Sequence, residues 1–234
     1  MMEISFTNIM ELFINICRFI FHYHLYDLLV NYWANCTFVK NLVGTGHSNF
    51  YHEIRYRFGA TLHAFYTAFY VTLYLLDMSE PEYLKIIFAN SMAYCIYDLY
   101  NIFCKTDDEP HRYEFVVHHT LMFMVLFLNY ESPNINRINI LCTALLTEWS
   151  TIFLNFSITM YRSGYGSTMV FKINKWLTLV TYFSFRIVMF AYVLYLTYLE
   201  SNFFGVIATI FYGLNWFWFY RLIQSASKKP KKVM

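Results

Sequence analysis

The sequence predicts an all-α membrane protein: a polytopic bundle of about seven transmembrane helices around an interior polar cavity. Composition is the first observation, since 58% of the 234 residues are hydrophobic and only 14% are charged, whereas a soluble domain carries about 25% charged residues. The second is the recurrence of apolar segments of roughly 17–25 residues, the length of a membrane span. The third is that polar residues inside these segments share helix faces and depths, which favours a common cavity.

Seven apolar segments follow one another along the chain and define the expected helices. Only helices or closed barrels satisfy every backbone group in lipid, and these segments are too long and too continuously apolar for barrel strands. The first segment is the weakest, so a position in the membrane interface is an alternative for it. The segments are Thr7–Val30, Phe58–Leu76, Tyr83–Phe103, Glu114–Tyr130, Ile138–Met160, Trp176–Tyr198 and Phe203–Ile223.

The distribution of lysine and arginine predicts the orientation of the bundle, because these residues collect in cytoplasmic loops. With the N-terminus outside, thirteen of them fall in cytosolic stretches and only Lys85 and Arg137 fall on the opposite side. The C-terminus is then cytosolic. The cytosolic set is Lys40, Arg55, Arg57, Lys105, Arg112, Arg162, Lys172, Lys175, Arg221, Lys228, Lys229, Lys231 and Lys232.

The C-terminal tail ends in Lys231-Lys232-Val233-Met234. Lysines at the third and fourth positions from a cytosolic C-terminus match the dilysine signal that coat machinery reads when it returns proteins to the endoplasmic reticulum. We therefore expect a protein of the endoplasmic-reticulum membrane, with the coat machinery as a partner through Lys231 and Lys232. A basic tail that contacts anionic lipid is the alternative.

Five of the segments carry polar residues inside the apolar stretch, where an ionisable group is costly unless it faces a partner or a water-filled cavity. Spacings of three, four and seven residues place several of them on one helix face. His63, Asp98 and the His118–His119 pair lie four to six residues from the cytosolic ends of their segments. This shared depth predicts a polar cavity that opens toward the cytosol. The set is His63, Tyr94, Tyr97, Asp98, Asn101, Glu114, His118, His119, Glu148, Thr151, Asn155, Thr178, Tyr182 and Arg186.

The adjacent imidazoles of His118 and His119 are the most informative part of this set. Glu114 stands four residues before His118 and is expected to hydrogen-bond it from the same helix face. Successive helical residues point about 100° apart, so the two rings cannot both reach one atom of a substrate. We expect one ring to contact the substrate and the other to support it.

Arg186 and Glu148 lie nearer the middle of the membrane. A buried guanidinium needs an anion, and Glu148 or Asp98 is the expected partner. Any single polar residue has an alternative role as a structural contact, since polar side chains hydrogen-bond between spans. The histidines expected at the interface or in solvent are His22, His24, His47 and His52.

The histidines are not spaced for a metal site. Their spacings are His22-x-His24, His47-x4-His52 and His111-x6-His118-His119, and none of these is the HxxxH or HxxHH box of membrane di-iron oxygenases and desaturases. No metal and no resident cofactor is expected. The orientation already explains the basic residues, so no nucleic-acid partner is expected either.

Five groups of residues, in order along the chain, resemble the TRAM–LAG1–CLN8 (TLC) domain family, most closely the small TLC-domain-containing subgroup and more distantly the ceramide synthases. The resemblance covers roughly residues 50–225. It divides the chain into an N-terminal membrane helix and cytosolic loop at 1–45, a TLC domain at 46–225 and a basic cytosolic tail at 226–234. The groups are Arg57…Leu62-His63-Ala64, Ala93-Tyr94…Tyr97-Asp98-Leu99, Glu114…His118-His119, Glu148-Trp149-Ser150-Thr151…Asn155 and Phe183…Phe185-Arg186.

The resemblance implies a role in lipid metabolism. Ceramide synthases transfer an acyl group from acyl-CoA to a sphingoid base, and by resemblance His118 would be the acyl-accepting nucleophile or the base. His119, Asp98 and Glu148 would be the other catalytic residues, and acyl-CoA would be a co-substrate. The implied substrate-binding residues are His63, Tyr97, Glu114, Thr151, Asn155 and Arg186.

Two departures from the ceramide synthase pattern leave two functions open. Those enzymes have His-His-x-x-Thr, where this chain has Phe123 in the last position. Their Asp-x-Ser-Asp element is replaced by Glu148-Trp149-Ser150-Thr151. The first function is acyl-CoA-dependent acyl transfer through the histidine pair. The second is non-enzymatic lipid binding, sensing or trafficking that uses the same cavity.

Overall fold

The computed structural model describes residues 6–35, 48–104, 112–130 and 134–227, and these residues form helices and short turns with no strand. The all-α fold class is therefore confirmed. The helices are α1 (Phe6–Asn35), α3 (Ser48–Leu75), α4 (Glu82–Cys104), α5 (Arg112–Asn129), α6 (Ile135–Leu145), α7 (Glu148–Arg162), the 3₁₀ turn η1 (Tyr165–Ser167), α8 (Met169–Tyr182), the π-helix η2 (Phe183–Met189), α9 (Phe190–Glu200) and α10 (Asn202–Ser227).

In the described part of the chain these elements make seven helical rods, one for each predicted apolar segment. Helices α6 and α7 form one bent rod, and α8, η2 and α9 form another. By length and composition alone, three described helices can cross a membrane: Ile135–Arg162, Met169–Glu200 and Asn202–Ser227. The other described rods are less apolar or, like α5, shorter.

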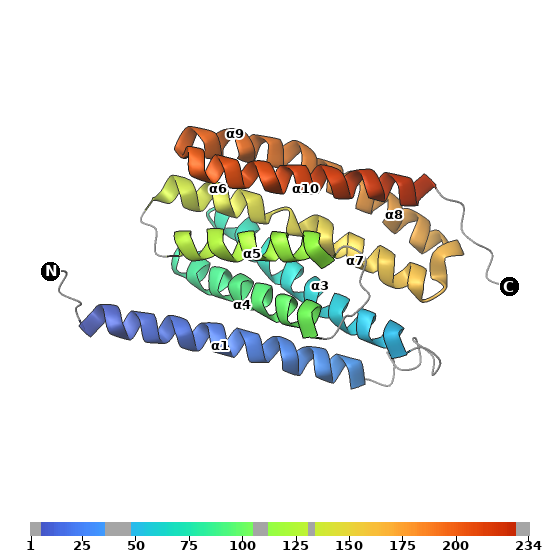
Figure 1. The fold of residues 1–234 in the computed structure, drawn as a ribbon, viewed down its shortest axis with the longest axis horizontal. Helices are drawn as coiled ribbons and strands as arrows, with labels where there is room; N and C mark the ends of the chain where they lie inside the picture. Colours follow the sequence, from blue (N-terminus) through green and yellow to red (C-terminus); the bar gives the residue numbers. More distant parts are fainter. Residues whose placement is uncertain (1–5, 36–47, 105–111, 131–133, 228–234) are drawn as a thin grey trace.

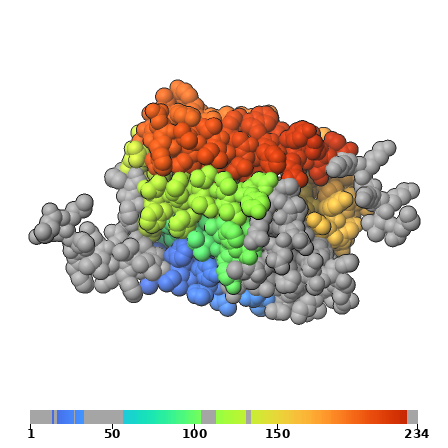
Figure 2. All heavy atoms as spheres, in the orientation of Figure 1, coloured from blue at the N-terminus to red at the C-terminus, as the bar shows by residue number. Residues whose placement is uncertain are grey.

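Successive rods run antiparallel, so α1 begins at one end of the bundle and α10 ends at the other (Figure 1). This arrangement is the one that an odd number of passes requires. Helix α5 lies between α4 and α10 on the face shown in Figure 2, with α9 and α10 along one edge and α1 along the other. Its two sides therefore contact different halves of the bundle.

Small side chains are buried along both α3 and α4. Ala60, Ala64 and Ala68 repeat every fourth residue of α3 and are all buried, as are Ala89 and Ala93 of α4. Lipid tails are as apolar as the side chains themselves, so helices in a membrane associate through close van der Waals packing, which small residues at every fourth position permit. Between α3 and α4 themselves, His63 and Thr67 each lie 3.2 Å from the Ser91 hydroxyl.

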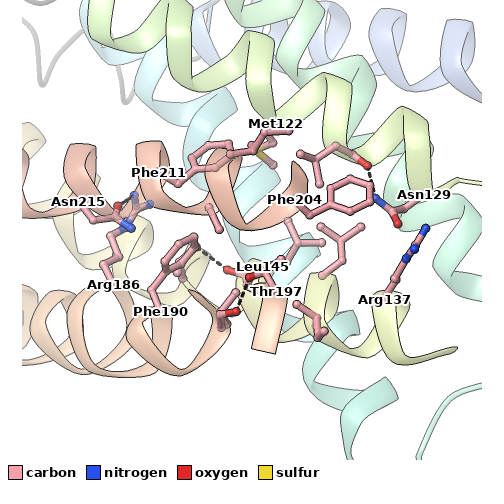
Figure 3. Close-up of a pocket in the computed structure, with 18 of the residues that line it drawn as sticks. Met122, Asn129, Arg137, Leu145, Arg186, Phe190, Thr197, Phe204, Phe211 and Asn215 are labelled. Atoms are coloured by element: carbon pink, nitrogen blue, oxygen red, sulfur yellow. Dashed lines mark hydrogen bonds between the residues drawn. The ribbon is translucent and has the colours of Figure 1, made fainter. Parts of the chain in front are cut away.

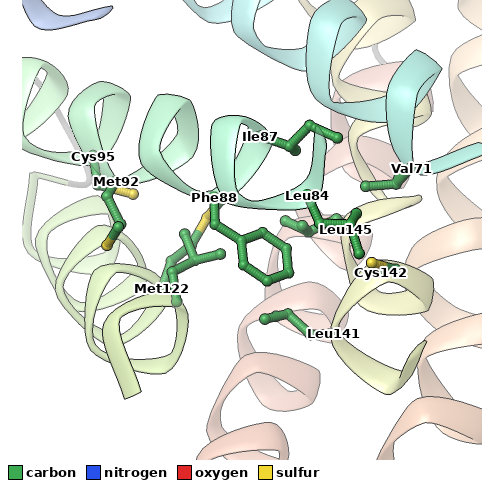
Figure 4. Close-up of a cluster of buried hydrophobic side chains, with 11 residues drawn as sticks. Val71, Leu84, Ile87, Phe88, Met92, Cys95, Met122, Leu141, Cys142 and Leu145 are labelled. Carbon is green, nitrogen blue, oxygen red and sulfur yellow. The ribbon is translucent and has the colours of Figure 1, made fainter. Parts of the chain in front are cut away.

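The main apolar core joins α3, α4, α5 and α6. Figure 4 shows Phe88 and Met92 of α4 packed against Met122 of α5 and Leu141 and Leu145 of α6. All five side chains are buried. The core fixes the rotation of α5 about its own axis, and with it the directions in which His118 and His119 point.

Two rods depart from α-helical geometry. Between α6 and α7 the backbone makes bonds to the third residue back, such as Thr147 N to Ala144 O at 3.1 Å and Ser150 N to Thr147 O at 3.1 Å. The hydroxyls of Thr147 and Ser150 also donate to carbonyls three residues earlier, and such bonds bend helices. The second departure is the π-helix η2, a form that is rare and frequent at functional sites.

Candidate functional site

The two adjacent histidines of α5 point to different surroundings. The His119 ring is buried, and its Nε2 donates to Asp98 Oδ2 of α4 at 2.7 Å. The His118 ring instead lines a cavity on the other side of the helix. The ring centroids are 5.1 Å apart and the planes nearly perpendicular, as the 100° step of a helix requires.

His119 and Asp98 belong to a closed polar network between α1, α3, α4 and α5. The Tyr94 hydroxyl donates to Asp98 Oδ1 at 3.4 Å, and its ring stacks on His63 with centroids 4.1 Å apart. His63 Nε2 lies 3.2 Å from the Ser91 hydroxyl. These side chains are buried, so the network connects the helices inside the bundle and leaves little access for a substrate.

The cavity lies between α5, α6, α7, η2, α9 and α10 and has a volume of about 110 Å³. Its middle is apolar, and its two ends are polar (Figure 3). One end, called the Arg186 end, holds Arg186 and Asn215, and the other, called the Arg137 end, holds Asn129 and Arg137, which pairs with Glu200. The polar lining also includes His118, Thr147, Glu148 and Thr197. The middle includes Met122, Ile140, Leu145, Phe190, Ile207 and Phe211.

Arg186 joins three rods at its end of the cavity. From η2 its Nε donates to Ser150 Oγ at 2.8 Å and its Nη2 donates to Thr151 Oγ1 at 2.7 Å, both on α7. Its Nη1 donates to Asn215 Oδ1 of α10 at 3.3 Å. The bend before α7 and the π-helix therefore meet at this guanidinium, and the two departures from α geometry aim it at its partners.

The Arg137 end is closed by an ion pair. Arg137 Nε donates to Glu200 Oε1 at 2.9 Å, and Asn134 donates to the same oxygen at 2.7 Å. The Arg137 guanidinium also lies 5.4 Å from the ring centroid of Phe204. These contacts tie the start of α6 to the end of α9 and the start of α10.

The structure divides the predicted site residues between different places. His118, Glu148 and Arg186 line the cavity, and Thr151 contacts Arg186. His63, Asp98 and His119 lie in the closed network, with the buried Tyr97 packed nearby against Tyr26. Asn155 of α7 accepts a hydrogen bond of 3.4 Å from Arg57 of α3. The interior space is consequently amphipathic, and its apolar middle was not part of the prediction.

Two expected contacts are absent from the described residues. Glu114 makes no hydrogen bond with His118, whose buried Nδ1 has no partner. Arg186 has neither Glu148 nor Asp98 within 4.0 Å, because Asp98 is engaged by His119 and the guanidinium is held by hydroxyl and amide oxygens. His22 also differs from expectation, since it is buried beside Tyr66 instead of lying at the interface.

Asn215 is the site residue that sequence reasoning missed. It is buried, lines the cavity and accepts from Arg186. A signal was available, because Asn215 is an amide inside the apolar segment Phe203–Ile223, where polar groups are expensive. Arg137 and Glu200 were assigned to loops, and only the fold brings them to one cavity.

A bundle of helices, three of which are long and apolar enough to cross a membrane, defines a helical membrane protein. The chain belongs to the TLC domain (TRAM_LAG1_CLN8) family, whose match covers residues 57–224. This membership indicates a membrane function related to lipid. No curated protein matched the chain when their sequences were compared.

Proposed function

We propose that the protein binds the acyl chain of a lipid in the cavity and acts in membrane lipid metabolism. The observation that carries this proposal is the shape of the cavity: an apolar middle between two polar ends. Along α5 it runs from His118 to Asn129, about 16 Å at about 1.5 Å per residue. An extended acyl chain fits a space that is long, narrow and apolar, and it leaves its polar head at one of the ends.

Filling the cavity tests the proposal. Ala208 is buried and lines the cavity, so Ala208→Phe is expected to displace the chain. Ala191 of the neighbouring helix α9 is exposed, so Ala191→Phe is the matched control. Purified protein would be examined by native mass spectrometry for co-purified lipid. Loss of lipid in the Ala208 variant alone supports the cavity, and equal lipid in both variants would refute it.

Acyl transfer through His118 is the second candidate function. It is favoured by the position of this imidazole, which lines the cavity and has a buried Nδ1 without a partner. In this reaction a ring nitrogen attacks the thioester of acyl-CoA, the carbon–sulfur bond breaks, and CoA leaves as the thiol with the proton. The acyl-imidazole then passes its acyl group to an acceptor amine or hydroxyl.

Intact-protein mass spectrometry after incubation with acyl-CoA separates the two functions. The enzyme is expected to gain the mass of one acyl group, and His118→Ala is expected to abolish this gain. His24→Ala changes an exposed histidine and serves as control. Unmodified protein that carries intact lipid, equally in wild type and His118→Ala, would eliminate the enzymatic function and leave the binding function.

We further propose residence in the endoplasmic reticulum with a cytosolic C-terminus that coat machinery contacts. The proposal rests on the dilysine pattern of Lys231 and Lys232, which lie outside the described residues, and on the distribution of basic residues. Replacement of both lysines by serine is expected to move a fluorescently tagged protein to later compartments. Replacement of Lys228 and Lys229 is the charge-matched control. Unchanged localisation in both variants would contradict the retrieval signal.

A further inference from the structure

We infer that the Arg186 end of the cavity is a binding site for an anionic head group, so that the preferred ligand is a single-chain lipid with a carboxylate or phosphate. This inference rests on the proposed function, since the chain of the ligand would occupy the apolar middle. It adds the chemistry of the head group and the residue that recognises it.

Arg186 is a buried cation without a carboxylate partner. Its relative exposure is 7%, and none of the described residues places a carboxylate oxygen within 4.0 Å of it. Asp98 pairs with His119, Glu200 pairs with Arg137 at the other end of the cavity, and Glu148 lines the cavity without an ion pair to Arg186. A charged side chain within the membrane is costly unless it is paired or faces water. An anion from a ligand would supply the missing charge.

The guanidinium also keeps hydrogen-bonding capacity for such a ligand. It has five N–H donors, and the structure accounts for three of them, one each on Nε, Nη1 and Nη2. Each terminal nitrogen therefore retains one N–H, with the Tyr182 ring beside them, its centroid 5.3 Å from the guanidinium carbon. Guanidinium N–H groups are preferred donors to carboxylate and phosphate oxygens. Because Arg186 lines the cavity, a head group there can reach it.

Arg186 and two of its hydrogen-bond acceptors lie where the backbone departs from α-helical geometry. Arg186 lies in the π-helix η2, and its acceptors Ser150 and Thr151 stand in the first turn of α7, directly after the bend. The acceptors are hydroxyl and amide oxygens, which hold the guanidinium in place and leave its charge uncompensated.

Glu148 is the acidic residue of the cavity lining that would oppose an anion at Arg186. It is buried, lines the cavity and makes no hydrogen bond or ion pair within the described residues. If it balanced Arg186 across the cavity, the site would have no need of an anionic ligand. Wild-type protein therefore distinguishes the two arrangements, because only an uncompensated Arg186 gives it a preference for an anion over a neutral lipid. Glu148→Gln should tighten the binding of the anion further and leave the binding of the neutral lipid unchanged.

Binding of oleate, 1-oleoyl lysophosphatidate and monoolein to the full-length protein in nanodiscs tests the inference, because the three ligands share one chain and differ in head group. Wild-type protein is expected to bind oleate or lysophosphatidate about ten- to hundredfold more tightly than monoolein, as hydrogen bonds to charged groups are worth that factor. Tighter binding of oleate would identify a carboxylate as the preferred head group, and tighter binding of lysophosphatidate would identify a phosphate.

Two arginine variants complete the test. Arg186→Gln is expected to remove the preference for the anion, and Arg186→Lys, which keeps the charge, should restore part of it. Arg221→Gln is the matched control, because Arg221 is exposed on α10 and does not line the cavity, and it should keep the preference.

Equal binding of all three ligands would overturn the head-group inference and leave the acyl-binding function standing, whereas binding of none would contradict the proposed function itself. If Arg186→Gln does not fold, the wild-type comparison and Glu148→Gln still decide. A Glu148→Gln protein that binds oleate no more tightly than wild type would also count against the inference.

Discussion

Asp98 and His119 are expected to contribute to the free energy of unfolding as a coupled pair, so that losing either side chain removes much of what the other contributes. The side chains are 1% and 8% exposed and meet at 2.7 Å, so neither can turn to water when the other is lost. Asp98→Asn and His119→Gln should each destabilise the protein by about 1.5–3 kcal/mol, the value of a hydrogen bond to a charged group. The double variant should cost less than the sum, with a coupling energy of about 1–3 kcal/mol.

Reversible unfolding in mixed micelles, followed by circular dichroism as the denaturing detergent is increased, would measure these free energies. Arg137→Gln combined with Asp98→Asn provides the control cycle, because Arg137 lies at the far end of the cavity. That control should be additive within about 0.5 kcal/mol. Additive costs for the Asp98 and His119 pair as well would refute the idea that the two side chains form one unit.

Three further predictions concern packing, chain length and the tyrosine of the network. Ala64 is fully buried in α3, so Ala64→Leu should overpack it and destabilise the protein by about 1–3 kcal/mol in the same unfolding experiment, and an unchanged midpoint would contradict close packing there. Glu200→Gln should weaken the contact to Arg137 at the Arg137 end of the cavity, and the mass distribution of co-purified lipid should shift to longer acyl chains. An unchanged distribution would show that the ion pair does not limit the length of the bound chain. Tyr94→Phe keeps the ring on His63 and loses the 3.4 Å hydrogen bond to Asp98, so its cost should be about 0.5–1.5 kcal/mol. A larger loss would mean that the hydroxyl organises the network.

The sequence predicted the rods better than their irregularities. Hydropathy identifies a span because lipid imposes a uniform requirement over its whole length. The bend between α6 and α7 contains neither glycine nor proline, and it forms because the hydroxyls of Thr147 and Ser150 bond to nearby carbonyls. Serine and threonine make that choice according to their tertiary surroundings, which single-sequence patterns do not contain.

The candidate site was predictable from the sequence where helix geometry alone determines the direction of a side chain. The divergence of His118 and His119 follows from the turn of the helix, but which ring meets Asp98 depends on the rotation of α5 set by the apolar core. The expected bond from Glu114 to His118 did not form, because a spacing of four residues permits a contact without requiring it. Equal depth in the membrane likewise did not reveal that α5 separates two groups of polar residues.

The position of Arg186 links the supply of lipid to the lifetime of the protein. Its guanidinium hydrogen-bonds from η2 to α7 and α10, so it connects three rods. By the inference above, the same guanidinium would bind the head group of a ligand. A ligand that binds only the folded state stabilises that state in proportion to its concentration. An anionic lipid at Arg186 would hold the rods together more firmly, and molecules without lipid would unfold and be degraded first. The amount of this protein in a membrane would then follow the amount of the lipid it carries.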